Sequence, residues 1–315
     1  QSYPVKPVKL VVPYAAGGAT DAYARLYARK YTEAWGQPVV VENRAGGTGL
    51  IGTRVVLQAP GDGYTLLFTS NSAHLVGPLA HDPRPFDSLR DFTPVSMVIR
   101  YPMYLVANPS LPAKNIAEFI ALLKANPGRY SFSSVGTGSG THLACELFNL
   151  NAGTQMLHVP YKGAAPAQTA VMGGEVQLMC DSVGFSQALV DAGKLRGLAL
   201  TGERRSPAVP SIPTLAEAGA GKVNVDMWYG VFAPPGSAPD FVARLNRELR
   251  EILALPEVRT AFQTQGMDPA ASSPDEFRRL VEQEAQRLLV LAHREVLERA
   301  NAHVARRHAG QDRAW

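Results

Sequence analysis

The sequence predicts an α/β protein built from two lobes. Short apolar runs alternate with segments of helix length, which is the pattern of βαβ units, and this pattern begins again after residue 103. A length of 315 residues suits two domains better than one. Hydrophobic residues make up 46% of the chain and charged residues only 18%, which is enough apolar material for two buried cores.

The first hundred residues predict three strands and the two helices that connect them. We expect strands at 8–12, 39–42 and 64–69, and helices at 21–35 and 50–58. The first helix has Ala, Leu and Tyr on one face and ends before Gly36, a residue type common after helices. Because a helix connects each strand to the next, the sheet is predicted to be mainly parallel.

The second stretch repeats this organisation. We expect strands at 104–107, 130–134, 156–159, 176–181 and 197–200, a helix at 116–126, and further helices that begin at Thr141, Ala164 and Phe185. The run Val223 to Ala233 is apolar and aromatic and predicts a strand that returns to the first lobe. Two crossings, near 102–107 and 224–231, would form a two-strand hinge between a first lobe of residues 1–103 plus 227–315 and a second lobe of residues 104–226.

The last helix has a clear predicted start. Ser273 is a suitable N-cap, Pro274 a suitable first residue, and Glu276 completes a capping box. An apolar stripe at helical spacing predicts that this helix packs against a core, and packing across both lobes is one arrangement we consider. The stripe consists of Phe277, Leu280, Val281, Leu288, Leu291 and Val296.

Charge and hydropathy exclude several classes of function. The net charge is +4, but Lys and Arg are scattered among acids instead of clustering with aromatic residues, so we expect no nucleic-acid binding. The sequence contains no run of eighteen or more apolar residues, so it predicts no membrane span. Since no leader precedes Gln1, we expect the mature form of an exported protein whose signal peptide has been cleaved.

The sequence contains no motif for catalysis, metals or cofactors. Nucleotide-binding, hydrolase and zinc signatures are all missing, so we expect a protein that is not an enzyme and has no metal or cofactor. Cys145 and Cys180 are the only cysteines, and their spacing fits neither a metal site nor a redox motif. They are either buried free thiols or, in an oxidising compartment, a disulfide within one lobe.

Two glycine-rich loops, each between a strand and a helix, are the candidate binding elements. Small residues let backbone amides approach a ligand, and a helix N-terminus offers unpaired donors with partial positive charge. The loops therefore predict two anion-binding sites. The first contains Tyr14, Ala15, Ala16, Gly17, Gly18 and Ala19, and the second contains Ser134, Gly136, Thr137, Gly138 and Thr141.

Both loops follow strands at the carboxyl edge of a sheet, where ligands of open α/β sheets bind. If the loops face each other, they form a clamp around an elongated carboxylate, and Ser70, Asn71 and Thr141 add hydroxyl or amide contacts. Asp21 has two interpretations, as a cap that complements the helix dipole or as an acceptor for a ligand amino or hydroxyl group. Asp181 and His158, at other strand ends, have the same two interpretations, structural or ligand-binding.

Six segments, taken together, resemble a known family. The chain is similar to the solute receptors of tripartite tricarboxylate transporters, also called the Bug family, from about residue 4 to residue 268 and again in the last helix. The matching segments are LVVPYAAGGATDAYAR, VVVENRAGGTGLIG, PGDGYTLLFTS, HVPYKGAAPA, AGKLRGLALTGERRSPAVPSIPTLAEAG and WYGVFAPPGSAP.

The resemblance implies a periplasmic receptor with the type II binding-protein fold, a Venus flytrap that closes on a ligand. The implied ligand is a dicarboxylate, an acidic amino acid or a related organic acid, held mainly by backbone donors and water and delivered to membrane permease subunits. Carried over to this sequence, one wall of the site is Tyr14 to Asp21 with Ser70 and Asn71. The opposite wall is Ser134 to Thr141, His158, Asp181 and Phe185.

The sequence also departs from the family pattern on the second wall. Ser182 and Gly184 stand where the family more often has Asn and Pro, and Cys180 replaces a commoner larger residue, so this wall is expected to accept a different ligand. We expect a monomer. Two alternatives to a transport receptor stay open: a protein that presents its ligand to a membrane sensor kinase, and an enzyme that acts on a small organic acid in the cleft.

Overall fold

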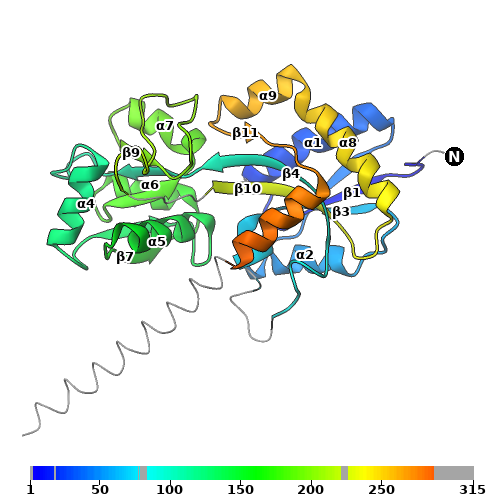
Figure 1. Ribbon diagram of the computed structural model, residues 1–315, viewed down its shortest axis with the longest axis horizontal. Coiled ribbons are helices and arrows are strands. Elements are labelled where there is room, and N and C mark those ends of the chain that lie inside the picture. Colours follow the sequence, from blue (N-terminus) through cyan, green and yellow to red (C-terminus); the bar gives the residue numbers. More distant parts are fainter. Residues whose placement is uncertain (1–2, 18, 77, 79–83, 221–225, 287–315) are drawn as a thin grey trace, which may run out of the picture.

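Two α/β lobes lie side by side in a computed structural model of the chain, in which residues 3–17, 19–76, 78, 84–220 and 226–286 are described (Figure 1). The first lobe contains a six-stranded sheet with the strand order β11-β4-β10-β3-β1-β2. Its strands are β1 (Val8–Val12), β2 (Val39–Asn43), β3 (Thr65–Ser70), β4 (Thr93–Pro102), β10 (Asp226–Ala233) and β11 (Asp268–Pro269).

Helices cover both faces of this sheet (Figure 1). They are α1 (Ala19–Trp35), α2 (Leu50–Leu57), α8 (Pro239–Ala254), α9 (Pro256–Gln263) and an unlabelled helix over residues 274–286. Because successive side chains of a strand point to opposite faces, β1 contributes to two cores. Val8 and Leu10 pack in the core that contains α1 and α8, whereas Val11 packs in the core that contains α2 and Phe277.

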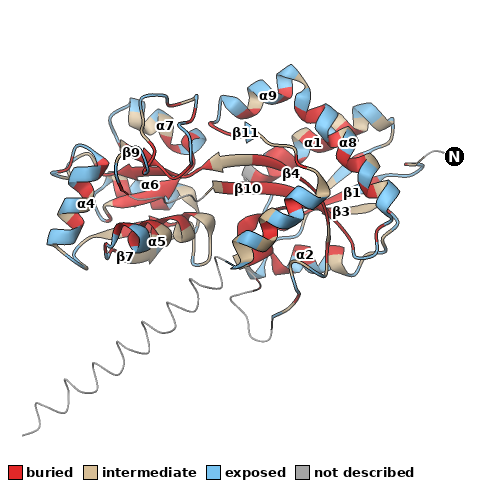
Figure 2. Ribbon diagram, in the orientation of Figure 1, coloured by how far each residue is buried: buried red, intermediate tan, exposed pale blue. Residues whose placement is uncertain are grey.

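The second lobe contains a five-stranded sheet with the order β7-β6-β8-β5-β9. Its strands are β5 (Tyr104–Ala107), β6 (Ser131–Ser134), β7 (Leu157–Pro160), β8 (Leu178–Asp181) and β9 (Arg196–Leu200), and its helices are α4 (Ile116–Ala125), α5 (Gly140–Ala152), α6 (Ala164–Met172) and α7 (Val183–Asp191). Strand β5 again divides its side chains between two cores: Leu105 packs with α4 and α5, and Val106 packs with α6 and α7. Figure 2 shows the buried residues concentrated along both sheets.

Two strands connect the lobes. Strand β4 leaves the first sheet and is separated from β5 of the second sheet only by Met103, while β10 runs antiparallel beside β4 from Asp226 opposite Pro102 to Ala233 opposite Thr93. The first part of the predicted return strand, residues 223–225, lies outside the described residues.

The expectation of a mainly parallel sheet was incomplete, because both sheets are mixed. Strands β1, β2 and β3 are parallel, as are β6, β7 and β8, but β4, β5 and β10 pair antiparallel with their neighbours. The parallel strands are those joined by helical crossovers. Strands β5 and β10 arrive from the other lobe and have no such crossover. Strand β4, which is ten residues long and follows β3 in the first lobe, was not predicted by the sequence.

The last helix begins where the capping box predicted. Ser273 N–H donates to Glu276 Oε2 at 2.8 Å, and Glu276 N–H donates to Ser273 Oγ at 3.2 Å. Phe277 and Val281 pack against Trp228 in the first lobe; Leu288, Leu291 and Val296 of the predicted stripe lie outside the described residues. Among the residues described, no helix is long and apolar enough to cross a membrane.

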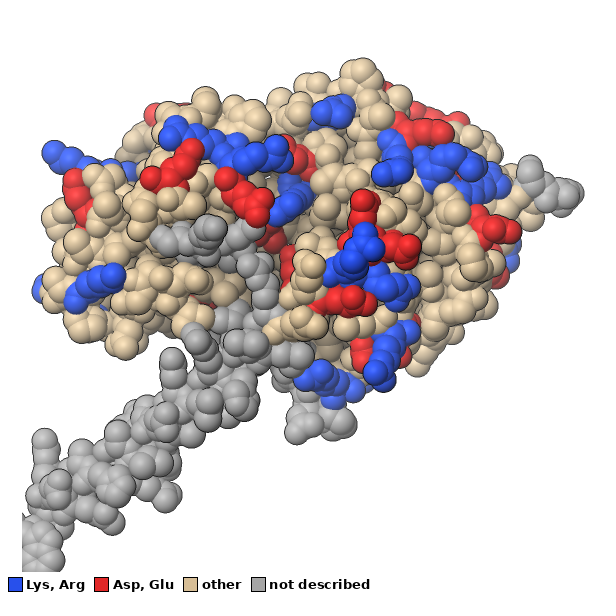
Figure 3. Space-filling view, in the orientation of Figure 1, with Lys and Arg blue, Asp and Glu red and all other residues tan. Residues whose placement is uncertain are grey.

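Basic and acidic side chains are interspersed over the visible face of the molecule (Figure 3). Ion pairs among the charged side chains of the described residues include Lys30 with Glu33 and Arg205 with Glu217.

Candidate ligand-binding cleft

A cavity of about 470 Å³ lies between the two lobes, against the hinge strands. Its floor contains Tyr101, Met103, Met227 and Tyr229, which share a face because Met227 is directly opposite Tyr101 in the β4–β10 ladder. One wall comes from the first lobe and includes Tyr14, Thr20, Ser70 and Ser72; the other comes from the second lobe and consists of residues 135–141, Ala164, Asp181, Ser182 and Phe185. Met267 completes the lining. We call this cavity the cleft.

The glycine loop of the second lobe holds its shape through its own hydrogen bonds. Val135 N–H donates to Thr141 Oγ1 at 3.0 Å, Ser139 Oγ donates to the Gly136 carbonyl at 2.6 Å, and Gly138 N–H donates to His142 Nδ1 at 3.2 Å. Gly136 and Gly138 have φ values of 137° and 77°, which side-chain-bearing residues rarely adopt. Glycine at these two positions therefore allows the turn from β6 into α5.

Three backbone N–H groups of this loop have no protein acceptor among the described residues: those of Thr137, Gly140 and Thr141. Gly140 and Thr141 are the first two residues of α5, where an α-helix leaves its amides unpaired and its dipole is positive. All three residues line the cleft. We call these N–H groups the amide cluster, and its chemistry suits an anion.

The first-lobe wall presents neutral hydroxyl groups that already bond to one another. The Tyr14 and Ser70 hydroxyl oxygens are 2.5 Å apart, and Thr20 Oγ1 donates to the Tyr229 hydroxyl at 3.3 Å. Burial raises the pKa of both Tyr14 and Tyr229 above the ordinary tyrosine value, so both stay protonated. No Lys, Arg or His belongs to the lining formed by the described residues.

Most of the first glycine loop does not reach the cleft. Ala15, Ala16 and Gly17 are exposed, and the Gly17 N–H, predicted to receive a ligand, donates to Asp21 Oδ2 at 2.9 Å. Ala19 begins α1, and Gly18 lies outside the described residues. Among the described residues of 14–21, only Tyr14 and Thr20 line the cleft.

Asp21 has protein partners for its Oδ2 atom, whereas its buried Oδ1 has none among the described residues. Its carboxylate accepts a hydrogen bond from Arg25 Nε at 2.9 Å as well as the one from Gly17, and it does not line the cleft. Burial raises the pKa of Asp21, but these hydrogen bonds outweigh burial and hold it below its usual value. It is thus an ionised residue that stabilises the start of α1.

Asp181 does line the cleft, but the protein occupies its oxygens. Its Oδ2 accepts hydrogen bonds from Gln168 Nε2 and Ser186 Oγ, both at 2.7 Å, and its Oδ1 accepts one from Ser182 N–H at 2.8 Å. The residue is only 4% exposed, and burial raises its pKa above the usual range despite these donors.

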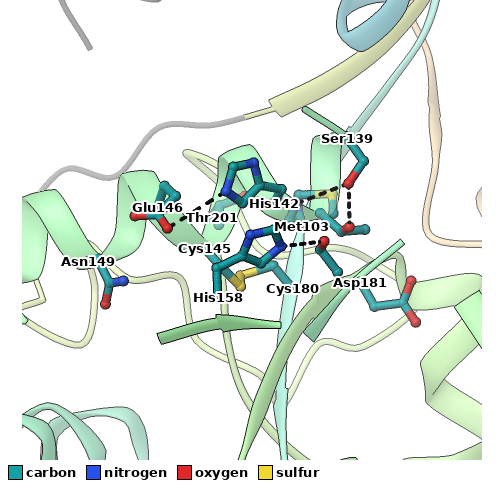
Figure 4. The surroundings of a disulfide bond; sticks show 12 residues. Met103, Ser139, His142, Cys145, Glu146, Asn149, His158, Cys180, Asp181 and Thr201 are labelled. Atoms are coloured by element: carbon teal, nitrogen blue, oxygen red, sulfur yellow. Dashed lines mark hydrogen bonds and ion pairs between the residues drawn. A yellow bond between two sulfur atoms is a disulfide. The ribbon is translucent and has the colours of Figure 1, made fainter. Parts of the chain in front are cut away.

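His158, Ser134 and Asn71 support the cleft from outside its lining. His158 Nε2 lies 2.7 Å from Ser134 Oγ, and its ring stacks on His142 with centroids 3.9 Å apart (Figure 4). Burial, and secondly the neighbouring His142, lower the pKa of His158 to about 4, so the ring is neutral at physiological pH. Asn71 is buried and directs its Nδ2 toward the Asp226 carbonyl, 3.5 Å away.

The two cysteines form a disulfide, which resolves the alternatives left open by the sequence. Cys145 in α5 and Cys180 in β8 are buried, with Cα atoms 5.7 Å apart. The bond links the helix that begins at the amide cluster to the strand that ends at Asp181 (Figure 4).

The sequence did not predict the floor of the cleft. Met103, Met227 and Tyr229 fall in the predicted hinge but were not candidate site residues, and neither were Tyr101, Ser72, Ser182 and Met267. The alternation of Met227 and Tyr229 in a predicted strand was an available signal, since such residues point to one face. Which face borders the cleft depends on how the lobes are placed, and the sequence pattern does not show this.

Comparisons with known proteins agree with this architecture. The family model described as "Tripartite tricarboxylate transporter family receptor" (TctC) matches residues 23–295. Protein BugT of Bordetella pertussis is 40% identical over 287 residues, which cover 91% of this chain and 88% of BugT.

Solved structures give the same assignment. An R. palustris protein solved with adipate is 34% identical, has a TM-score of 0.82, and is matched over 92% of this chain and 97% of its own. MatC from Rhodopseudomonas palustris with bound malate is 31% identical, has a TM-score of 0.78, and is matched over 90% of this chain and 98% of its own. The expected two-lobed binding-protein fold is therefore confirmed.

These relatives and neighbours are solute-binding proteins, which confirms the expectation that the chain is not an enzyme. The match covers most of the chain, including the hinge and the second-lobe wall, and begins after Tyr14 and Thr20 of the first-lobe wall. This chain belongs to the TctC, or Bug, family of periplasmic solute-binding receptors.

Proposed function

We propose that this protein captures a small organic carboxylate in the cleft and delivers it to the membrane permease subunits of a tripartite transporter. The observation that supports this most directly is the amide cluster: three N–H groups without a protein acceptor among the described residues, in the second glycine loop and at the start of α5, border a cavity between two lobes. Such donors stabilise a carboxylate without a cationic side chain. The site of action is the periplasm, reached with a signal peptide that is later removed.

The ligands of the two neighbouring structures support the same class of solute. Adipate and malate are both small dicarboxylates, and each is named with a structure that matches this chain over both lobes. A cavity of about 470 Å³ lies within the range of pockets that enclose small molecules.

For this role we propose a first lobe of residues 1–103 plus 227–315, a second lobe of residues 104–226, and closure by rotation about the two connecting strands. Separate cores on either side of the hinge support rigid-body motion. The protein is proposed to act as a monomer.

Calorimetric titration of the purified protein with adipate, malate and glutamate tests binding. We expect saturable binding of at least one acid, together with a rise in melting temperature at excess ligand. Absence of binding to every acid would contradict the proposal.

Delivery to a transporter is tested separately, in a strain from which the gene has been deleted. We expect uptake of the bound acid to fall and to return when the gene is restored. Unchanged uptake, with loss of a transcriptional response to the acid, would point instead to presentation of the ligand to a sensor kinase.

A further inference from the structure

The cleft has an apolar floor between two polar walls, which bears on the kind of carboxylate it accepts. The amide cluster lies on the second-lobe wall and hydroxyl groups lie on the first-lobe wall, whereas the floor consists of methionine and tyrosine side chains. Methionine is flexible and polarisable and packs well against aliphatic or aromatic groups. Apart from Tyr14, the methionine and aromatic residues of the lining are Met103, Met227, Met267, Tyr101, Tyr229 and Phe185.

Because side chains alternate along a strand, the charged residues of the hinge lie outside the lining of the cleft. Arg100 and Asp226 form an ion pair, and they alternate along β4 and β10 with Tyr101 and Met227. They line a different crevice, of about 310 Å³. The hinge therefore presents apolar side chains to the cleft and its charged side chains elsewhere.

A second polar group belongs with the amide cluster. Ser182 is 7% exposed and lines the cleft, and its Oγ has no hydrogen-bond partner among the described residues. It follows β8, which is adjacent to β6, the strand that leads into the glycine loop. An unpaired buried hydroxyl is costly, so Ser182 Oγ is suited to donate to an oxygen of the bound ligand.

Elsewhere in the described lining, only the hydroxyl groups of Ser72 and Thr137 have no protein partner. Tyr14 and Ser70 bond to each other, Thr20 bonds to Tyr229, and three protein donors occupy the carboxylate of Asp181. An ammonium group would thus have no free carboxylate, and hydroxyl groups on the ligand body would lose their hydration without equivalent bonds.

From these observations, and resting on the proposed function, we infer that the preferred ligand is a carboxylate with an apolar body. Its carboxylate is held by the amide cluster and Ser182, and its aliphatic or aromatic framework lies against the methionine and tyrosine side chains of the hinge. Acids that have hydroxyl or amino groups along the body are disfavoured.

Matched ligand pairs test the inference. Adipate and galactarate have the same six-carbon chain and two carboxylates, but galactarate adds four hydroxyl groups; benzoate and trihydroxybenzoate form an aromatic pair. By calorimetry at one pH, we expect the unsubstituted member of at least one pair to bind about 10- to 100-fold more tightly, the discrimination typical of an apolar pocket.

Variants separate the two parts of the site. Met227→Gln changes polarity with little change of size and should reduce the preference for the unsubstituted acid at least threefold. The control is Met172→Gln, which should leave the preference unchanged because Met172 is half-buried in α6 and lies outside the lining. Ser182→Ala should weaken both members of a pair by a similar factor, about 10-fold, because it removes a bond to the shared carboxylate.

Each outcome bears on a different proposal. Equal affinities within both pairs, or tighter binding of the hydroxylated acids, would overturn the apolar-body inference and leave the carboxylate receptor intact. Failure of all four acids and of malate and glutamate to bind would instead overturn the proposed function. If Met227→Gln melts like the parent and keeps the same preference for the unsubstituted acid, Met227 does not contribute to recognition of the ligand body.

Discussion

Asp21 and Asp181 occupy similar places in the sequence, each beside the start of a helix, yet their environments differ. Asp21 is paired with Arg25, and its pKa is lowered although burial opposes this. Asp181 has only neutral donors, and burial raises its pKa. Only Asp181 lines the cleft. The partners of each carboxylate, and not its position along the chain, therefore set the direction of its pKa shift.

His74 is the residue whose titration should affect stability most clearly. It is fully buried, stacks on Phe232 and bonds through Nε2 to the Ser88 carbonyl, while burial lowers its pKa to about 4. An unfolded histidine titrates near 6.5. Between these values the unfolded chain binds more protons than the folded one, so stability falls as the pH decreases from about 6.5 to about 4.

Urea unfolding at pH 7.5 and pH 4.5 measures this effect. We expect the free energy of unfolding to be lower at pH 4.5 than at pH 7.5, and His74 to account for about 3 kcal/mol of this difference. In His74→Gln the pH dependence should shrink, with a remainder from His158. Phe119→Leu, a core change in the other lobe, should lower stability equally at both pH values; an unchanged pH dependence in His74→Gln would contradict the assignment.

At the scale of elements, α5 and β8 form a covalently linked unit beneath the second-lobe wall. The disulfide joins Cys145 to Cys180 across 35 residues of sequence. The chain between them includes β7 and α6, so the link restricts a large loop of the unfolded chain. Both ends are close to the site, because α5 starts at the amide cluster and Cys180 precedes Asp181.

Removal of this bond should destabilise the protein strongly. For a loop of 35 residues the chain-entropy model gives about 4 kcal/mol. We expect dithiothreitol to lower the urea midpoint of the parent protein, and Cys145→Ala with Cys180→Ala to show a low midpoint that dithiothreitol does not change. Equal midpoints for the oxidised parent and the double variant would contradict a stabilising role.

At the scale of the whole molecule, glycine occurs at several points where the two lobes meet. A Cβ atom at Gly140 would lie 2.2 Å from Met227 Cε, and one at Gly266 would lie 2.6 Å from Val183 Cβ. A Cβ atom at Gly184 in α7 would lie 3.1 Å from Gln265 Cβ. These contacts join the second lobe to the hinge and to the turn before β11, so glycine permits the close packing of the lobes at these points.

A larger side chain at Gly184 should hold the lobes apart. Gly184→Leu is expected to weaken ligand binding at least about 10-fold, because closure must overcome a steric overlap of the kind that costs 1–3 kcal/mol in packed cores. Stability without ligand should not fall, since leucine favours a helix more than glycine does. Small-angle X-ray scattering should show less compaction on ligand addition than in the parent.

The control for this experiment is Ala188→Leu, an exposed position in the same helix. It should leave both the affinity and the ligand-induced compaction at the level of the parent. If Gly184→Leu binds and compacts like this control, the contact with Gln265 is not a closure contact.

The sequence by itself determined the class of fold, most elements and the second glycine loop, because these depend on local patterns: apolar periodicity, capping residues and glycines at turns. Strand β5 occupies 104–107 as predicted, and the last helix starts after Ser273. Only the tertiary structure decided that β4 is a strand, that Cys145 pairs with Cys180, and that Tyr101 and Met227 form the floor of the cleft. Those features arise between residues far apart in the chain, where the partner and the exposed face are set by how the two lobes pack and not by any local propensity.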